Sequence, residues 1–163
     1  MKSLVAYFSW SGATRGLAQD IARKTGSDLF EIAPLSEYSR DYNSVMEESE
    51  REVKNHVLRP IDDSALDFSA YDIIYVGTPV WWGTMAPPIA SFLDEHEWAG
   101  KVVMPFCTHG GGGKTFTEKD MKKLFGGADV RPMFVSRSRD HRADEAKLDA
   151  WLIKNGCAAA VSA

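Results

Sequence analysis

Cysteine is scarce in this sequence, and long apolar runs are missing. The two cysteines, Cys107 and Cys157, lie far apart with no Cys or His at metal-ligand spacing, which argues against a disulfide framework and a zinc site and favours a reducing compartment. The apolar run at residues 4–8 is too short for a signal peptide or a membrane span. We therefore expect a cytoplasmic protein with no metal site and no membrane span.

An excess of basic residues is also lacking. The 19 Lys and Arg are outnumbered by 23 Asp and Glu, so the net charge is −4. Nucleic-acid binding needs clustered Lys and Arg, so this balance argues against it. An acidic surface would instead attract proteins with basic surfaces. The hydrophobic fraction of 44% in 163 residues predicts one domain that spans residues 1–163.

Hydrophobic periodicity predicts strands that alternate with helices. Short apolar runs predict strands at residues 4–8, 28–33, 73–76, 102–107 and 130–135. Helical spacing follows the first run, at Leu17, Ala18, Ile21 and Ala22, and recurs at residues 42–57, 88–95, 118–125 and 144–155. Residues between Pro34 and Tyr42 have no assignment. The pattern predicts a three-layer α/β/α fold with a five-stranded parallel sheet, whose ligands bind at the carboxyl ends of the strands.

The loop after the first strand reads Ser9-Trp10-Ser11-Gly12-Ala13-Thr14-Arg15. It offers three hydroxyls, a glycine for close backbone approach and the amides of a helix N-terminus. These neutral donors suit one terminal phosphate better than a triphosphate with magnesium. A serine-rich turn that caps a helix is the alternative, and Arg15 either adds charge or faces solvent.

The loop after the third strand contains two adjacent indoles, Trp81 and Trp82. Large aromatic side chains on a loop need a planar partner or a core to cover them, and an isoalloxazine ring is one such partner. The alternative is that both tryptophans cap the end of the sheet.

The loop after the fourth strand contains four consecutive glycines, Gly110 to Gly113, which favour a backbone that approaches a ring closely. Gly113-Lys114-Thr115 resembles the end of a P-loop, but the first glycine of that motif would stand at position 108, which is Thr108. A Cys-x5-Arg phosphatase loop also fails, because the sixth residue after Cys107 is Gly113.

Other polar groups are interpreted as solvated. His56 and His96 lie on helices or at their ends, and Cys157 is expected only to pack. A charged loop follows the fifth strand and contains Arg137, Arg139, Asp140, His141 and Arg142. One interpretation is that it touches a substrate or a nicotinamide phosphate. The simpler interpretation, which we favour, is a solvated loop.

Together the three loops resemble those of the flavodoxins, and particularly of the branch whose second loop reads Pro-x-Trp-Trp-Gly. The resemblance covers nearly the whole chain and implies strand order 2-1-3-4-5 with FMN at the switch point. It implies that the first loop holds the phosphate, that Trp81 or Trp82 stacks on the ring, and that residues 108–112 line its pyrimidine edge. The implied cofactor-binding residues are Ser9, Trp10, Ser11, Gly12, Ala13, Thr14, Arg15, Thr78, Pro79, Val80, Trp81, Trp82, Gly83, Met85, Thr108, His109, Gly110, Gly111 and Gly112.

Two departures from the family pattern bear on function. Many relatives have Asn where Ala13 stands, and many flavodoxins place a tyrosine on the outer flavin face where this sequence has only His109 and glycines. One flavin face is therefore expected to be more open than in a dedicated electron carrier.

Three functions remain open. We favour a low-potential electron carrier, in which a backbone carbonyl near Gly83 accepts a hydrogen bond from the flavin N5–H. The alternative is an FMN-dependent NAD(P)H:quinone-type oxidoreductase, motivated by the open face, His109 and Arg137. A flavin-free binding module is the third.

Overall fold

The structure is a computed structural model that describes residues 1–138 and 141–155. Its centre is a parallel sheet, which contains β1 (Ser3–Tyr7), β2 (Asp28–Glu31), β5 (Ile73–Trp81), β7 (Val102–His109), β8 (Asp129–Val130) and β9 (Phe134–Arg137). The strand order is β2-β1-β5-β7-β8, and β9 also pairs with β7. The predicted order 2-1-3-4-5 is therefore confirmed.

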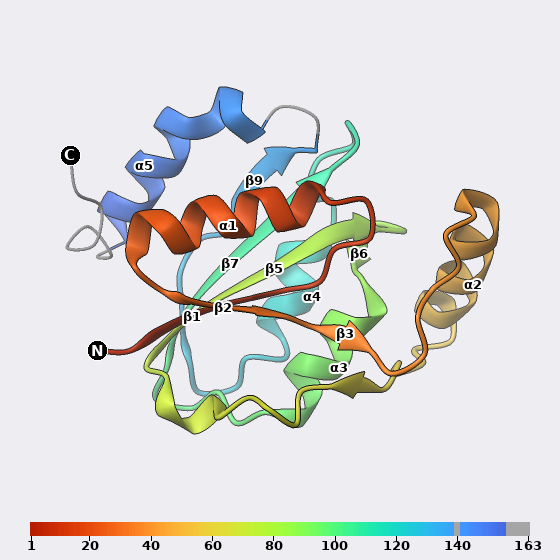
Figure 1. The fold of residues 1–163 in the computed structure, drawn as a ribbon, viewed down its shortest axis with the longest axis horizontal. Helices are drawn as coiled ribbons and strands as arrows, with labels where there is room; N and C mark the ends of the chain where they lie inside the picture. The colour runs from red at the N-terminus through yellow and green to blue at the C-terminus, as the bar shows by residue number, and fades with distance from the viewer. Residues whose placement is uncertain (139–140, 156–163) are drawn as a thin grey trace.

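Helices cover both faces of the sheet (Figure 1). One face packs against α1 (Ala13–Thr25) and α5 (Glu145–Lys154), and the other against α3 (Pro87–Glu95) and α4 (Thr117–Lys122). Two short 3-10 helices are η1 (Phe68–Ala70) and η2 (His141–Asp144). The α/β/α layers are confirmed.

Alternation along the strands explains the two cores. In β1, Val5 and Tyr7 pack with α1 and α5, whereas Leu4 and Ala6 belong to the core on the opposite face. Gly77 of β5 is required by packing, because a Cβ there would lie 2.2 Å from the Phe106 ring. These central strands are apolar on both faces because both faces are covered.

The third and fifth predicted strands differ most from the expectation. The third continues to Trp81 and turns back as a hairpin with β6 (Thr84–Met85), which pairs antiparallel with β5. The fifth is divided into β8 and β9 by residues 131–133. Pro132 has no N–H to donate, and the Met133 N–H donates to the Glu118 carboxylate (2.8 Å) instead of to the sheet. The helix predicted at residues 118–125 is also shorter in the structure, where α4 spans Thr117–Lys122.

Residues 33–62 form a separate structure at one end of the sheet. Here β3 (Ala33–Pro34) pairs antiparallel with β4 (Ile61–Asp62), and α2 (Tyr42–Lys54) lies at this end and contacts α3 (Figure 1). The segment that the sequence left unassigned is held by Arg59, which is 6% exposed. Its guanidinium donates to the Ser36 carbonyl (2.6 Å) and lies 3.6 Å from the centre of the Tyr38 ring.

Candidate cofactor site at the carboxyl edge of the sheet

The three loops predicted to bind a ligand lie at one edge of the sheet. Strand register places Tyr7 opposite Gly77, and Thr78 opposite Cys107, so β1, β5 and β7 reach this edge together. The hydroxyls of Thr14 and Thr108 join the first and third loops by a buried hydrogen bond of 2.8 Å. The predicted gathering of the loops is therefore confirmed, although this hydrogen bond also means that neither hydroxyl is exposed for a ligand.

The N-terminus of α1 offers donors that the protein does not use. Gly12 precedes the helix with φ of 98°, its N–H donates to the Ser9 hydroxyl (3.1 Å), and no side chain of the described residues caps the helix. Ser11 is exposed and Ser9 is half-buried. Free amides at a helix N-terminus, next to two hydroxyls, form a site for an anion such as a phosphate.

Two predicted residues of this loop point elsewhere. Arg15 forms an ion pair with Glu31 at the end of β2. The Trp10 indole N–H donates to the Ser39 carbonyl (3.0 Å), and its ring lies beside Tyr42. In this structure, positive charge at the anion site therefore comes from backbone dipoles and not from Arg15.

The two tryptophans have different surroundings. Trp81 is 8% exposed and packs edge-on against Phe8 and Tyr38, with ring centroids 5.4 and 5.3 Å away. Trp82 is 48% exposed, and its indole N–H donates to Ser49 of α2 (3.0 Å). Both Trp82 and Gly83 have positive φ, 55° and 79°, as a two-residue hairpin turn of type I′ requires. The turn therefore leaves Trp82 as the indole that can meet a ligand.

The rest of the second loop is mainly structural. Met85 is buried in the core, and the buried Thr78 hydroxyl accepts the Ala86 N–H (3.0 Å). Pro79 and Val80 remain partly exposed. The Gly83 carbonyl accepts hydrogen bonds from the Thr115 hydroxyl (2.6 Å) and the Phe116 N–H (2.9 Å). Reorienting the Gly83 peptide toward a flavin N5–H would break both bonds, a restraint the sequence did not indicate.

In the third loop His109 organises the glycines. Its Nδ1 accepts the N–H groups of Gly111 (3.0 Å) and Gly113 (3.1 Å), so this nitrogen must be unprotonated. Gly110, Gly111 and Gly112 are exposed and present bare backbone at the edge. Cys107, two residues earlier in β7, is buried, and burial raises the pKa of its thiol to about 12. The loop can therefore bind through its backbone but has no reactive thiolate.

The last residue of β9, Arg137, supplies a cation beside the glycine loop. Arg137 lies opposite His109 in the register and is exposed. His109, Gly110, Arg137 and Ser138 line a cavity of about 310 Å³. Residues 139–140, the His141 side chain and Cys157 lie outside what the structure describes. Arg142 is exposed, which agrees with a solvated position.

One prediction about the histidines was wrong. The His96 side chain is only 17% exposed, stacks on Phe68 at 4.2 Å and contacts the Asp63 carboxylate (2.6 Å). Together with Glu95 these two residues bring possible metal-ligand atoms within 4.8 Å of one another, away from the three loops. Contacts between residues distant in sequence bury His96, so helix position alone could not reveal them. His56 is exposed, as predicted.

The sheet order and the three loops define an α/β protein of flavodoxin-like fold with an uncapped helix N-terminus at the carboxyl edge of its sheet. A family model described as Flavodoxin matches residues 2–155, and the chain belongs to this family. The search of curated proteins gave no match. No helix of residues 1–138 and 141–155 is long and apolar enough to cross a membrane.

Solved structures agree with this assignment. A candidate flavoprotein from Bacteroides eggerthii is 31% identical with a TM-score of 0.81, covering 94% of this chain and 96% of that chain. Another, from Bacteroides uniformis, is 27% identical with a TM-score of 0.79, covering 90% and 97%. A flavoprotein from Lactobacillus acidophilus, solved in complex with FMN, is 26% identical with a TM-score of 0.72, covering 92% and 97%.

Proposed function

We propose that this chain binds FMN non-covalently at the carboxyl edge of the sheet and acts as a low-potential electron-transfer protein. The observation that carries the proposal is the uncapped N-terminus of α1 beside Ser9, Ser11 and Gly12. FMN ends in a single phosphate, which these amides and hydroxyls suit without a lysine or magnesium. Membership of the flavodoxin family and the FMN complex of the Lactobacillus relative support the choice of cofactor.

The other two loops provide groups that fit the ring. When bound, FMN supplies a ring that takes up and releases electrons. Trp82 is half-exposed and is our choice for the stacking contact, because Trp81 is already covered by the core. The exposed backbone at residues 110–112 suits the polar edge of the ring, and His109 holds that backbone in place through two hydrogen bonds.

Surface charge supports a carrier that docks on proteins with basic surfaces. Glu47 and Glu50 are exposed on α2, which touches the Trp82 indole through Ser49. Acidic groups beside an exposed ring would steer a basic partner toward the cofactor. The cytoplasmic location inferred from the sequence stays a prediction.

One observation favours the reductase as the second candidate. Arg137 stands free of the core beside the glycine loop and the cavity of about 310 Å³. A guanidinium there would pair with a phosphate of NAD(P)H, which an electron carrier does not need. A quinone would then be the electron acceptor.

FMN affinity is the first measurement, with two glycine variants as a matched pair. Gly12→Ala and Gly26→Ala both place a Cβ at positive φ with open space around it, at opposite ends of α1. We expect Gly12→Ala to weaken FMN binding at least tenfold in a flavin-fluorescence titration, while Gly26→Ala retains the wild-type affinity. Equal affinities in the two variants, or no FMN binding by the wild type, would contradict the proposed site.

An anaerobic reductive titration then separates the two functions. Two resolved one-electron steps support the carrier. A single two-electron step, together with steady-state turnover of NAD(P)H and a quinone, supports the reductase, and that turnover should fall in Arg137→Ala. If Trp emission does not respond to added FMN, the flavin-free binding module becomes the better interpretation.

A further inference from the structure

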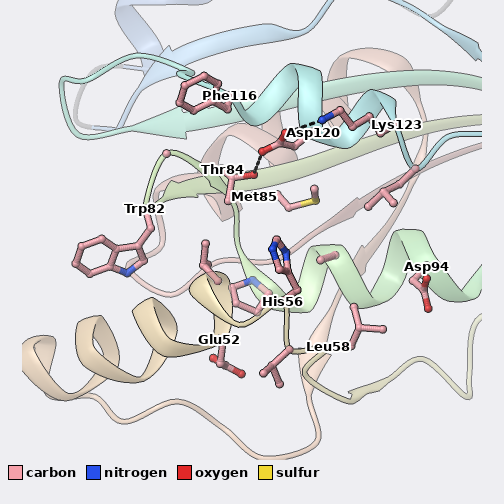
Figure 2. A pocket seen from close by; sticks show the side chains of 16 residues that line it. Glu52, His56, Leu58, Trp82, Thr84, Met85, Asp94, Phe116, Asp120 and Lys123 are labelled. Carbon is pink, nitrogen blue, oxygen red and sulfur yellow. Dashed lines mark hydrogen bonds and ion pairs between the residues drawn. The ribbon is translucent and has the colours of Figure 1, made fainter.

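Another cavity lies beside the β5–β6 hairpin. It has a volume of about 490 Å³ and is bounded by the end of α2 and the residues after it, the hairpin, α3, and α4 with the residues that flank it (Figure 2). This volume falls within the range of small-molecule pockets, roughly 300–1,000 Å³. Apart from Trp82 and Gly83, which it shares with the candidate FMN loop, its lining has no role in the function proposed above.

Exposed apolar side chains gather at this cavity. Ten large apolar or tyrosine side chains of the described residues are exposed, and five of them line it: Val57, Leu58, Trp82, Phe116 and Leu124. Scattered exposed apolar residues need no explanation, but a contiguous concave patch indicates a binding surface.

Backbone strain gathers at the same place. Among the described residues, the non-glycine residues with positive φ are His56 (52°), Trp82 (55°) and Thr115 (45°). His56 and Trp82 line the cavity, and Thr115 immediately precedes Phe116, which also lines it. Such conformations are costly for Trp and for β-branched Thr, and they concentrate at functional sites. This observation is independent of the apolar lining.

The polar groups of the lining define the ligand. Thr84 and Asp120 bind each other (2.7 Å), while no described residue hydrogen-bonds to the His56 ring, which projects toward Met85 (Figure 2). Lys123 is only loosely paired, 3.8 Å from Asp120, and 65% exposed. His56 and Lys123 therefore offer donors. Lys123 lies beside the Asp120 carboxylate and the exposed Asp94 adds a second carboxylate, so the lining disfavours an anion.

We infer that this cavity binds an uncharged, planar aromatic molecule that carries hydrogen-bond acceptor oxygens. Trp82 and Phe116 provide the aromatic faces, the aliphatic side chains cover the ligand, and His56 and Lys123 donate to its oxygens. The cavity shares Trp82 and Gly83 with the candidate FMN loop, so a ligand of this class is placed to serve as an organic electron acceptor. That role rests on the proposed function, whereas the binding does not.

The test uses coumarin as the probe, an uncharged bicyclic molecule with a carbonyl, and the full chain without FMN. We expect saturable shifts of the His56, Ala90 and Leu124 amide signals in an NMR titration. Leu58→Asp should weaken coumarin binding at least tenfold, because it places a charge in the apolar wall. Leu35→Asp is the matched control: Leu35 is 67% exposed, lies outside the cavity and should leave binding unchanged.

A second variant keeps the test decisive if Leu58→Asp does not fold. Ala90→Leu adds apolar volume inside the cavity from a helix position, where leucine is well tolerated, and it should abolish coumarin binding while the protein stays folded. Absence of saturable shifts, or equal affinity in the wild type and Leu58→Asp, overturns the inference. A third outcome also overturns it: coumarin does not bind, the wild type self-associates in sedimentation, and Leu58→Asp removes that self-association. The face would then be an interface between copies of this chain. FMN titration of the same samples tests the proposed function separately.

Discussion

On the face of the sheet covered by α1 and α5, apolar side chains fit closely around glycine and aromatic positions, whereas the face covered by α2, α3 and α4 also contains charge. Among the described residues, Arg59 is the one buried charged residue. Its guanidinium pairs with Glu48 (2.6 Å) and Glu52 (3.2 Å). The Glu52 carboxylate also accepts the Tyr38 hydroxyl (2.7 Å). The first face depends on steric fit and the second on a polar network, so substitutions should damage them differently.

The largest effect is expected from Arg59→Ala. It leaves the Ser36 carbonyl without its donor and the Glu52 carboxylate without its cation, and it removes the cation from the Tyr38 ring. Breaking a buried pair by removing one partner costs about 3–5 kcal/mol. Urea unfolding should show this loss, while Arg51→Ala, an exposed position on the same segment, should change stability little. Similar values for the two variants would show that the network does not stabilise this face.

Gly77→Ala tests steric fit on the opposite face. The new methyl group would lie 2.2 Å from the Phe106 ring, so the strand or the ring must move. Overpacking a core costs about 1–3 kcal/mol. Gly126→Ala, where nothing lies within 4 Å of the added Cβ, is the control. A Gly77→Ala protein as stable as wild type by thermal unfolding would mean that this face is loosely packed.

Thr14→Val examines the buried polar contact between the first and third loops. It leaves the Thr108 hydroxyl buried without its partner, which costs about 1–2 kcal/mol in stability. We also expect weaker FMN binding, because the loops are no longer joined. Thr14→Ser keeps the hydroxyl and should restore most of both properties. A Thr14→Val protein as stable as wild type in the same measurement would mean that the hydrogen bond does not stabilise the junction of the two loops.

The smallest effect is a pH dependence on the α3 side. Desolvation and the neighbouring Asp63 carboxylate raise the pKa of Glu95 to about 7 in the folded protein. A carboxyl with a raised folded-state pKa destabilises the fold as pH rises through that value, and the penalty is absent below its unfolded pKa. Glu95→Gln should therefore increase stability at pH 8–9 by only a few tenths of a kcal/mol, because solvent screens this exposed side chain.

Thermal unfolding between pH 4 and pH 9 checks this prediction. Glu97→Gln is the control, since Glu97 is exposed and adjacent in the chain. A gain that is equal at pH 4 and pH 9 would contradict the proposed cause, because Glu95 is protonated in both states at the lower pH.

Local pattern accounts for what could be predicted of the fold and the site. The apolar runs, the glycine and serine loops and the helical spacing each involve neighbours in the chain, and they predicted the strands, the layers and the gathering of three loops at one edge. The strand order came from the resemblance to flavodoxins and not from periodicity. The division of the fifth strand was missed because it depends on Glu118 as well as on Pro132.

The sequence by itself determined the alternation of strands and helices, the position of the candidate phosphate loop and the glycine-rich third loop, because periodicity and turn chemistry act within a few residues. Only the tertiary structure decided that Trp81 is covered by Phe8 and Tyr38 while Trp82 stays exposed. It also decided the network around Arg59 and the cavity beside the hairpin. These features join residues far apart in the chain, and their geometry exists only once the sheet and helices have packed.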